Sequence, residues 1–216
     1  MIVGLGSGTT AAEAIALLGK RVSAGLRITG VATSRATAVR AQRAGIPLIN
    51  FSDRAAVDLS IDGIDEIDPM FRAIKGAGGA MLREKVIGAA AGRMIAIADS
   101  SKEVAHLGTC SLPVEVLPFA TGFVGSALAN LGFASALRLN GMSPFVTDQG
   151  NWIIDCTGGN LVDLVDTAAS IAAIPGVLAH GLFLTEIDAL YVAAPGQPAV
   201  CLERNCAPAV RQRLQG

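Results

Sequence analysis

Short apolar segments alternate with helix-like segments along the first hundred residues of the chain. The apolar runs predict strands at 2–5, 27–33, 46–51, 56–61 and 94–98. Apolar positions at helical spacing predict helices at 11–18, 35–44 and 80–91. We expect these helices to end at the glycines that follow them, Gly19, Gly45 and Gly92. This alternation is typical of a parallel sheet covered by helices on both faces.

After Leu107 the pattern changes. It predicts a strand at 114–117, a helix at 120–131, a hairpin that turns at 148–151 and a helix at 161–173. The apolar segment 189–193 then returns to the first sheet, and the proline-containing tail from Pro195 is expected to be exposed. The predicted fold is α/β, a doubly wound, mostly parallel, Rossmann-like sheet with a small inserted α+β domain. The main domain is assigned to 1–108 plus 183–216 and the small domain to 109–182.

The composition fits a chain that buries a sizeable core, with 51% hydrophobic residues, 16% charged residues and a mean hydropathy of +0.52. Segments 116–137 and 167–185 are long enough to span a membrane and contain no charged residue. Prolines and glycines interrupt both, so we expect soluble helix and strand pieces and no membrane partner. Because no secretory leader is visible at the start, a cytoplasmic location is expected.

The charge balance argues against a nucleic-acid partner, because 17 basic residues face 18 acidic ones and only 4% of the residues are aromatic. A small neutral or singly anionic ligand fits this balance better. The four cysteines show no CxxC pair and no zinc-finger spacing, so reduced thiols are expected.

The first candidate site is the turn Gly6-Ser7-Gly8-Thr9-Thr10, which follows a predicted strand and opens a predicted helix. Glycines permit close backbone approach, while hydroxyls and helix N–H groups can donate to an anion. Thr10 and Glu13 have the spacing of a capping box. The turn matches neither a Walker loop nor a complete dinucleotide fingerprint, so a plain strand-to-helix turn is the alternative.

The second candidate is an acidic run that places Asp62, Asp65, Glu66 and Asp68 within seven positions after a strand. Like charges this close are unfavourable unless a cation, a proton or a ligand compensates them. Metal binding, acid–base chemistry and hydrogen bonding to a polyhydroxylated ligand are therefore open, with a solvated acidic loop as the alternative.

Three further charged residues lie near a glycine-rich segment or near the end of a predicted strand. Lys75 precedes the glycine-rich segment 76–79, and Glu84 lies on the helix that follows. A lysine at such a turn can meet an anion, whereas Glu84 alone would suit a surface ion pair. Lys102 follows another strand end, and its alternative is a solvated side chain.

Together these segments resemble the ribose-5-phosphate isomerase A family. The matching motifs, in the family's order, are 4–10 (GLGSGTT), 62–67 (DGIDEI), 75–80 (KGAGGA), 83–85 (REK) and 112–116 (LPVEV). Similarity continues through 146–151 and through 174–183 to about residue 195. Family members usually carry a helix before the strand that begins here at Ile2, so this chain is expected to be shorter at its amino end.

The resemblance implies an aldose–ketose isomerase that interconverts ribose 5-phosphate and ribulose 5-phosphate through an enediolate, with no cofactor and no metal. It implies Glu84 as the general base, Lys75 as the partner of the oxyanion, and Asp62 and Asp65 as ligands of the sugar hydroxyls. It implies a substrate and phosphate site that includes Ser7, Gly8, Thr9, Thr10, Gly63, Gly76, Gly78 and Lys102.

The family also implies a place in the pentose phosphate pathway and a homodimer or homotetramer. Two other functions stay open from the sequence. One is a non-catalytic module that senses sugar phosphates, and the other is a CoA- or acyl-transferring enzyme on a related sheet. The joint presence of Asp62, Asp65, Lys75 and Glu84 favours the isomerase over the sensor.

Overall fold

The computed structural model describes residues 1–159, 161–204 and 212–213. These residues cluster by their contacts into two compact units. The first unit comprises Met1–Ile64, Arg83–Glu103 and Thr185–Gly216, and the second comprises Asp65–Leu82 and Val104–Leu184. The clustering places segment 65–82 with the second unit, whereas the predicted main domain runs from 1 to 108.

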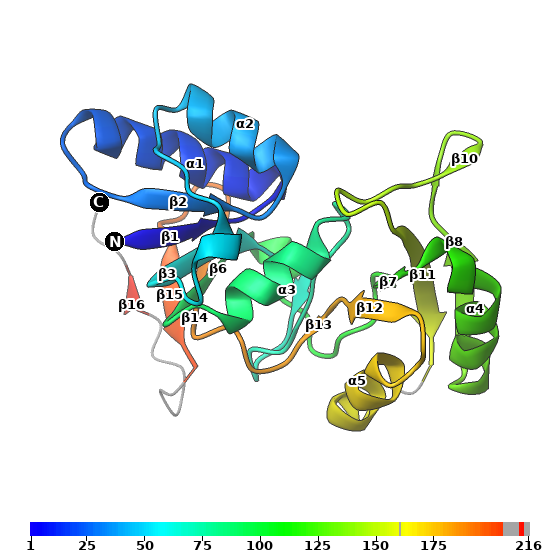
Figure 1. Cartoon of the computed structure of the whole chain (residues 1–216). Coiled ribbons are helices and arrows are strands. Elements are labelled where there is room, and N and C mark those ends of the chain that lie inside the picture. Colours follow the sequence, from blue (N-terminus) through cyan, green and yellow to red (C-terminus); the bar gives the residue numbers. More distant parts are fainter. Residues whose placement is uncertain (160, 205–211, 214–216) are drawn as a thin grey trace. The chain divides into compact units, whose positions relative to one another are not determined.

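A seven-stranded mixed sheet forms the centre of the first unit (Figure 1). Its strands, in spatial order, are β16 (Gln212–Arg213), β15 (Val200–Glu203), β14 (Ala189–Ala193), β6 (Met94–Asp99), β3 (Leu59–Gly63), β1 (Ile2–Leu5) and β2 (Thr29–Ala32). The five strands from β14 to β2 are parallel, while β15 and β16 add antiparallel edge strands. The doubly wound α/β fold predicted from the sequence is confirmed.

Helices cover this sheet on both faces, and the residues of β1 contact helices on each. Val3 and Leu5 pack in one cluster with Ile15 of α1 (Gly8–Ser23), on the face where α1 and α2 (Arg35–Arg43) lie side by side (Figure 1). The intervening Gly4 approaches Ile87 of α3 (Met81–Ala89). Since successive residues of a strand point to opposite faces, α3 covers the other face.

The second unit contains a four-stranded antiparallel sheet, with β12 (Val177–His180), β7 (Leu112–Val116), β11 (Trp152–Gly158) and β8 (Phe133–Leu137) in that order. Helices α4 (Thr121–Asn130) and α5 (Leu164–Ala172) bury Val124, Leu128 and Ile171 in the same cluster as the apolar residues of β7. Smaller pairings join β4 (Glu66–Ile67), β5 (Ala73–Ile74) and β13 (Leu182–Phe183), and β9 (Leu139–Asn140) with β10 (Ser143–Pro144).

The predicted end of α1 at Gly19 is wrong, because the helix continues to Ser23. Gly19 is buried in the helix, and a Cβ there would lie 2.5 Å from the carbonyl oxygen of Ala44. The glycine therefore permits close packing of α1 against the end of α2. By contrast, α2 does end just before Gly45, whose φ of 73° favours glycine.

Two predictions for strands and loops also need correction. Segment 46–51 is not a strand, since only one isolated bridge joins Leu48 to Gly30, and a 3₁₀ turn (Phe51–Asp53) follows. The tail is not a plain exposed ending, because β15 pairs with β14 and buries Cys201 and Leu202. Segments 205–211 and 214–216 of the tail lie outside the described residues.

The predicted strand at 189–193 is confirmed as β14, which lies parallel to β6. The hairpin turn at 148–151 is also present, with hydrogen bonds from the Thr147 N–H to the Asn151 carbonyl and from the Gly150 N–H to the Thr147 carbonyl. No helix within the described part of the chain has the length and apolar character needed to cross a membrane.

Candidate active site

The turn between β1 and α1 is held by the carboxylate of Asp62 at the end of β3. Asp62 Oδ1 accepts the N–H of Ser7 at 3.0 Å and the N–H of Gly63 at 2.7 Å. Gly6 makes this approach possible, because a Cβ there would lie 2.6 Å from the Asp62 Cα. Asp62 is only 1% exposed. The first unit therefore brings together Ser7, Asp62 and Gly63.

The hydroxyl of Ser7 lies in a cluster of hydroxyl groups that the sequence analysis missed. Ser7 Oγ lies 2.9 Å from Thr33 Oγ1, 2.9 Å from Ser34 Oγ and 3.2 Å from Thr37 Oγ1. Thr37 in turn donates to the Gly6 carbonyl at 2.8 Å. The available signal was the pattern Thr33-Ser34-x-x-Thr37 directly after β2, at the carboxyl end of a parallel strand.

The start of α1 is open to an anion. The capping box predicted at Thr10 and Glu13 is wrong, because α1 begins at Gly8 with Ser7 as its N-cap residue. Ser7 makes no side-chain capping bond, and no acidic residue lies in the first turn. Gly8, Thr9 and Thr10 are exposed. The N–H groups and partial positive charge of a helix start can therefore act on a bound phosphate here.

The acidic run is not a solvated loop. Asp62, Glu66 and Asp68 are 1%, 4% and 4% exposed, so water does not disperse their charges. Asp68 instead accepts the Arg72 Nε at 2.6 Å and the Met70 N–H at 2.9 Å. Buried carboxylates need such hydrogen-bonding partners, and each member of the run finds its own.

Glu66 binds the segment that leads into β7. Its Oε2 accepts the Gly108 N–H at 2.8 Å, and its Oε1 accepts the Thr109 hydroxyl and the Cys110 N–H. Burial alone would raise the pKa of Glu66, but these hydrogen bonds together lower it below its ordinary value. Glu66 is therefore ionised and structural.

Lys75 lies at the end of β5 within the second unit. Its side chain is 2% exposed, and its Nζ lies 5.4 Å from the centre of the Phe183 ring. The Lys75 N–H donates to the Gly181 carbonyl at 2.9 Å. Asp65 Oδ2 accepts the N–H of Ala77 in the loop that follows. The second unit thus brings Asp65 to the Ala77 N–H, between the predicted site residues Gly76 and Gly78.

Glu84 lies in the first turn of α3 and is only 6% exposed, so it is not a surface residue. The ion pair expected for a helix surface is formed by its neighbour Lys85, whose Nζ lies 3.3 Å from Glu186 Oε1. A buried carboxylate such as Glu84 is a candidate for proton transfer, since burial excludes the water that would otherwise compete.

Lys102 ends the 3₁₀ turn Ser100–Lys102 that follows β6 and is half-buried. Hydrogen bonds from Ser101 lower the pKa of Asp99, and the charge of Lys102 contributes to the same shift. Lys102 therefore lies near the carboxyl end of β6, where parallel sheets place their ligands.

The His, Cys, Asp and Glu side chains bear on two other kinds of site, a metal centre and a catalytic thiol. Within residues 1–159, 161–204 and 212–213, no three His, Cys, Asp or Glu side chains gather into a group that could hold a metal ion. Burial raises the pKa of Cys110 and Cys156 to about 12, so both thiols are protonated at neutral pH. Cys206 lies outside the described residues.

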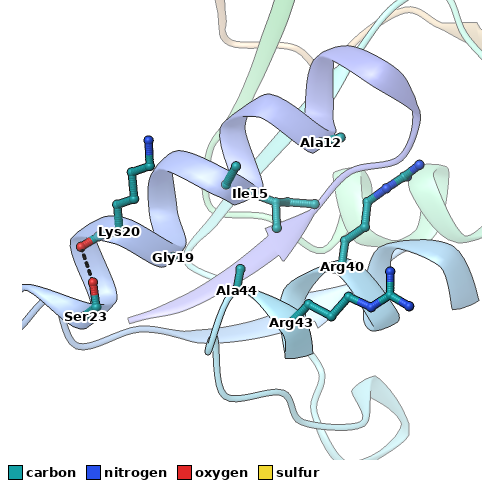
Figure 2. A pocket seen from close by; sticks show the side chains of 9 residues that line it. Ala12, Ile15, Gly19, Lys20, Ser23, Arg40, Arg43 and Ala44 are labelled. Atoms are coloured by element: carbon teal, nitrogen blue, oxygen red, sulfur yellow. Dashed lines mark hydrogen bonds between the residues drawn. The ribbon is translucent and has the colours of Figure 1, made fainter.

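A cavity of about 500 Å³ lies elsewhere in the first unit, between α1 and α2 (Figure 2). Its apolar lining includes Ile15, Gly19 and Ala44, and Lys20, Arg40 and Arg43 also line it. None of the predicted site residues lines this cavity. The cavity is therefore separate from the predicted site residues.

Comparison with known proteins identifies the family to which the chain is similar. The model of the family "Ribose 5-phosphate isomerase A (phosphoriboisomerase A)" matches residues 29–197. Ribose-5-phosphate isomerase A of Sphingopyxis alaskensis is 55% identical over 193 residues, which cover 89% of this chain and 85% of that protein. The protein of the same name from Roseiflexus sp. is 48% identical, with 90% and 85% covered.

Solved structures agree with this result. The ribose 5-phosphate isomerase of Plasmodium falciparum is similar with a TM-score of 0.91 at 30% identity, covering 95% of this chain and 92% of that one. A D-ribose-5-phosphate isomerase in complex with phospho-erythronic acid is similar with a TM-score of 0.90 at 34% identity, covering 94% and 91%. These similarities extend over both units.

Proposed function

The chain belongs to the ribose-5-phosphate isomerase A family, and from this premise we propose how its residues interconvert ribose 5-phosphate and ribulose 5-phosphate. The enzyme is an aldose–ketose isomerase of the pentose phosphate pathway. The observation that carries the proposed mechanism is the buried carboxylate of Glu84, which lies in the REK motif of the family resemblance. The sensor and acyl-transfer alternatives have no comparable support.

Glu84 is the general base. It takes the proton from C2 of the open-chain aldose, the C2–H electron pair forms the C1–C2 double bond, and the carbonyl oxygen at C1 takes up the negative charge. Returning the proton to C1, with movement of the hydroxyl proton from O2 to O1, gives the ketose. A positioned base of this kind contributes about 10²–10⁴-fold to the rate.

Lys75 stabilises the oxyanion that develops during this transfer. Its burial supports the role, because a positive charge acts more strongly where water is excluded. The Phe183 ring beside the ammonium attracts the positive charge without accepting its N–H groups as a carboxylate would.

Asp62 and Asp65 bind the sugar hydroxyls and assist proton transfer between the oxygens. In each, one carboxylate oxygen accepts backbone N–H groups, Oδ1 in Asp62 and Oδ2 in Asp65, which fixes the orientation of the group. A carboxylate fixed in this way holds a sugar hydroxyl in one position before the reaction begins. Less entropy is then lost when the transition state forms.

The phosphate lies at the start of α1, where Gly8, Thr9 and Thr10 supply exposed N–H and hydroxyl donors and Lys102 contributes positive charge. Ser7 acts mainly by holding the turn, because its hydroxyl is surrounded by Thr33, Ser34 and Thr37. Gly63, Gly76 and Gly78 contribute backbone without a side chain that would obstruct the sugar.

The test is conversion of ribose 5-phosphate to ribulose 5-phosphate by the purified chain in excess chelator. We expect full turnover without metal, and a fall in kcat of about 10³-fold in Glu84→Gln with KM little changed. The matched control is Glu186→Gln, which removes a different carboxylate charge of the same unit and should keep most of the activity. Turnover of Glu84→Gln within tenfold of the unsubstituted enzyme would exclude Glu84 as the base.

Assembly and location are part of the same proposal. A homodimer or homotetramer in the cytoplasm is supported by the family resemblance. Light scattering on the purified enzyme at several concentrations measures the oligomeric state. A monomer at every concentration would refute the proposed homodimer or homotetramer.

A further inference from the structure

The glycine-rich loop 76–79 that follows Lys75 is held by two side chains of the second unit. Arg138 donates from Nη1 to the carbonyl oxygens of Gly76 at 3.0 Å and Ala77 at 2.9 Å. Asp65 Oδ2 accepts the Ala77 N–H at 2.9 Å. The loop consists of three glycines and one alanine, so its own side chains cannot fix its conformation. Its conformation depends on these partners.

The guanidinium of Arg138 is itself fixed before it reaches the loop. Its Nε donates to Asp155 Oδ2 at 2.8 Å, and its Nη2 donates to Asp155 Oδ1. Its Cζ lies 5.8 Å from the centre of the Phe145 ring. A planar group held by a two-bond carboxylate pair and an aromatic ring has one orientation, which leaves Nη1 directed at the loop.

These anchors are parts of the β-structure of the second unit. The Arg138 N–H donates to the Ile153 carbonyl of β11 at 2.8 Å, and the Phe145 N–H donates to the Arg138 carbonyl at 2.8 Å. The Phe145 ring also contacts the far end of the loop, since a Cβ on Gly79 would lie 2.5 Å from it. Arg138 and Phe145 therefore fix the loop at both ends.

The loop in turn fixes Lys75. On one side, the Lys75 N–H is held by the Gly181 carbonyl. On the other, Gly76 has a φ of 113°, and its carbonyl accepts both the Gly79 N–H and Arg138. Release of the Gly76 and Ala77 carbonyls from Arg138 would loosen the backbone that follows Lys75 and let the ammonium shift from its position beside the Phe183 ring.

We propose that Arg138 is a positioning residue of the isomerase, which sets the direction of Lys75 by holding the carbonyl groups of Gly76 and Ala77. The inference rests on the proposed role of Lys75 at the oxyanion. Arg138 makes its contacts with the protein and acts on the reaction only through the loop.

The first test is steady-state kinetics of Arg138→Gln and Arg138→Lys. Because a misdirected Lys75 weakens an interaction that forms in the transition state, kcat should fall about 10–100-fold in Arg138→Gln while KM stays within about threefold. Arg138→Lys keeps the charge but not the planar fork, so it should recover only part of the loss. The control is Arg93→Gln, which removes the arginine of another ion pair, with Glu203, and should keep full turnover.

The second test combines Arg138→Gln with Lys75→Gln. If Arg138 acts through Lys75, the double variant is no slower than Lys75→Gln alone, because the interaction it directs is already absent. Effects that multiply would overturn the inference, since they indicate separate roles. Should Arg138→Gln fail to fold, Arg138→Lys is used in the same double-variant cycle.

The outcomes also separate this inference from the function on which it rests. Full turnover of Lys75→Gln would refute the role of Lys75 and the inference together. A slow Lys75→Gln beside a fully active Arg138→Gln would refute the inference alone. Faster amide hydrogen exchange of loop 76–79 in Arg138→Gln is the expected structural result.

Discussion

Replacement of Gly6 by alanine tests whether the turn before α1 and the Asp62 carboxylate form one rigid unit. The new Cβ would lie 2.6 Å from the Cα of Asp62 and nearer still to its carboxylate. Because the obstructing atoms include backbone, no side-chain rotation relieves the overlap. The turn must move away from β3, and the hydrogen bonds from the Ser7 and Gly63 N–H groups to Asp62 must lengthen or break.

The expected loss of stability follows from these two effects. An added methyl group in a packed site costs about 1–3 kcal/mol. A hydrogen bond to a charged group contributes about 1.5–3 kcal/mol, and some of that is lost as well. We therefore expect the free energy of unfolding, measured by urea denaturation, to fall by about 2–4 kcal/mol. The kcat/KM for ribose 5-phosphate should fall about tenfold or more, since the turn contains the proposed phosphate site.

Gly122→Ala provides the matched control. Gly122 lies in α4, and a Cβ there would have no neighbour within 4 Å. Alanine favours a helix over glycine by up to about 1 kcal/mol, so this variant should keep or slightly raise the free energy of unfolding. A Gly6→Ala enzyme with stability within about 0.5 kcal/mol of the unsubstituted chain and full turnover would refute the reasoning.

Two buried glutamates predict opposite dependences of stability on pH. Hydrogen bonds from Thr109 and neighbouring N–H groups outweigh burial and lower the pKa of Glu66 in the folded chain. The stability that ionised Glu66 contributes is therefore lost as the pH falls below about 4.3. Urea unfolding from pH 6 to pH 3 should show this loss, and Glu66→Gln should reduce it. Burial raises the pKa of Glu115 despite hydrogen bonds from Asn151 and Thr147, so the folded chain binds the extra proton and stability falls as the pH rises above about 4.3. Glu115→Gln should remove this second dependence, and an unchanged slope in either variant would contradict the assignment for that residue.

The elements that the sequence predicts best are those whose pattern reflects burial on both faces. Segments 94–98 and 189–193 are continuous apolar runs, and they are neighbouring strands of the sheet. The errors occur where contacts from elsewhere decide the outcome. Gly19 ends no helix because it packs on Ala44, and 46–51 is apolar without forming a strand because it covers the edge beside β2 with a single bridge.

The sequence predicts those parts of the candidate site that lie in short local motifs. Three local motifs contain charged or glycine residues that indicate a binding partner or a special backbone conformation. They are the turn at 6–10, the acidic run and the glycine-rich loop 76–79 that follows Lys75. The contacts of Ser7 with Thr33 and Thr37, and of Arg138 with Gly76, join residues about 26 to 62 positions apart. No local pattern encodes such pairs, because the order of strands in the sheet determines which turns meet.

The acidic run gains its meaning from this long-range pairing. Asp62 holds the turn before α1, Asp65 holds the Lys75 loop, and Glu66 holds the segment before β7, each through backbone N–H groups. Asp68, the fourth member, pairs with the guanidinium of Arg72. Backbone N–H donors and one arginine therefore offset the charges of the run. It follows that three carboxylates of the run each hold a different loop, and two of them, Asp62 and Asp65, also have a proposed role at the sugar hydroxyls. Removing one charge should therefore loosen only the loop that its own carboxylate holds.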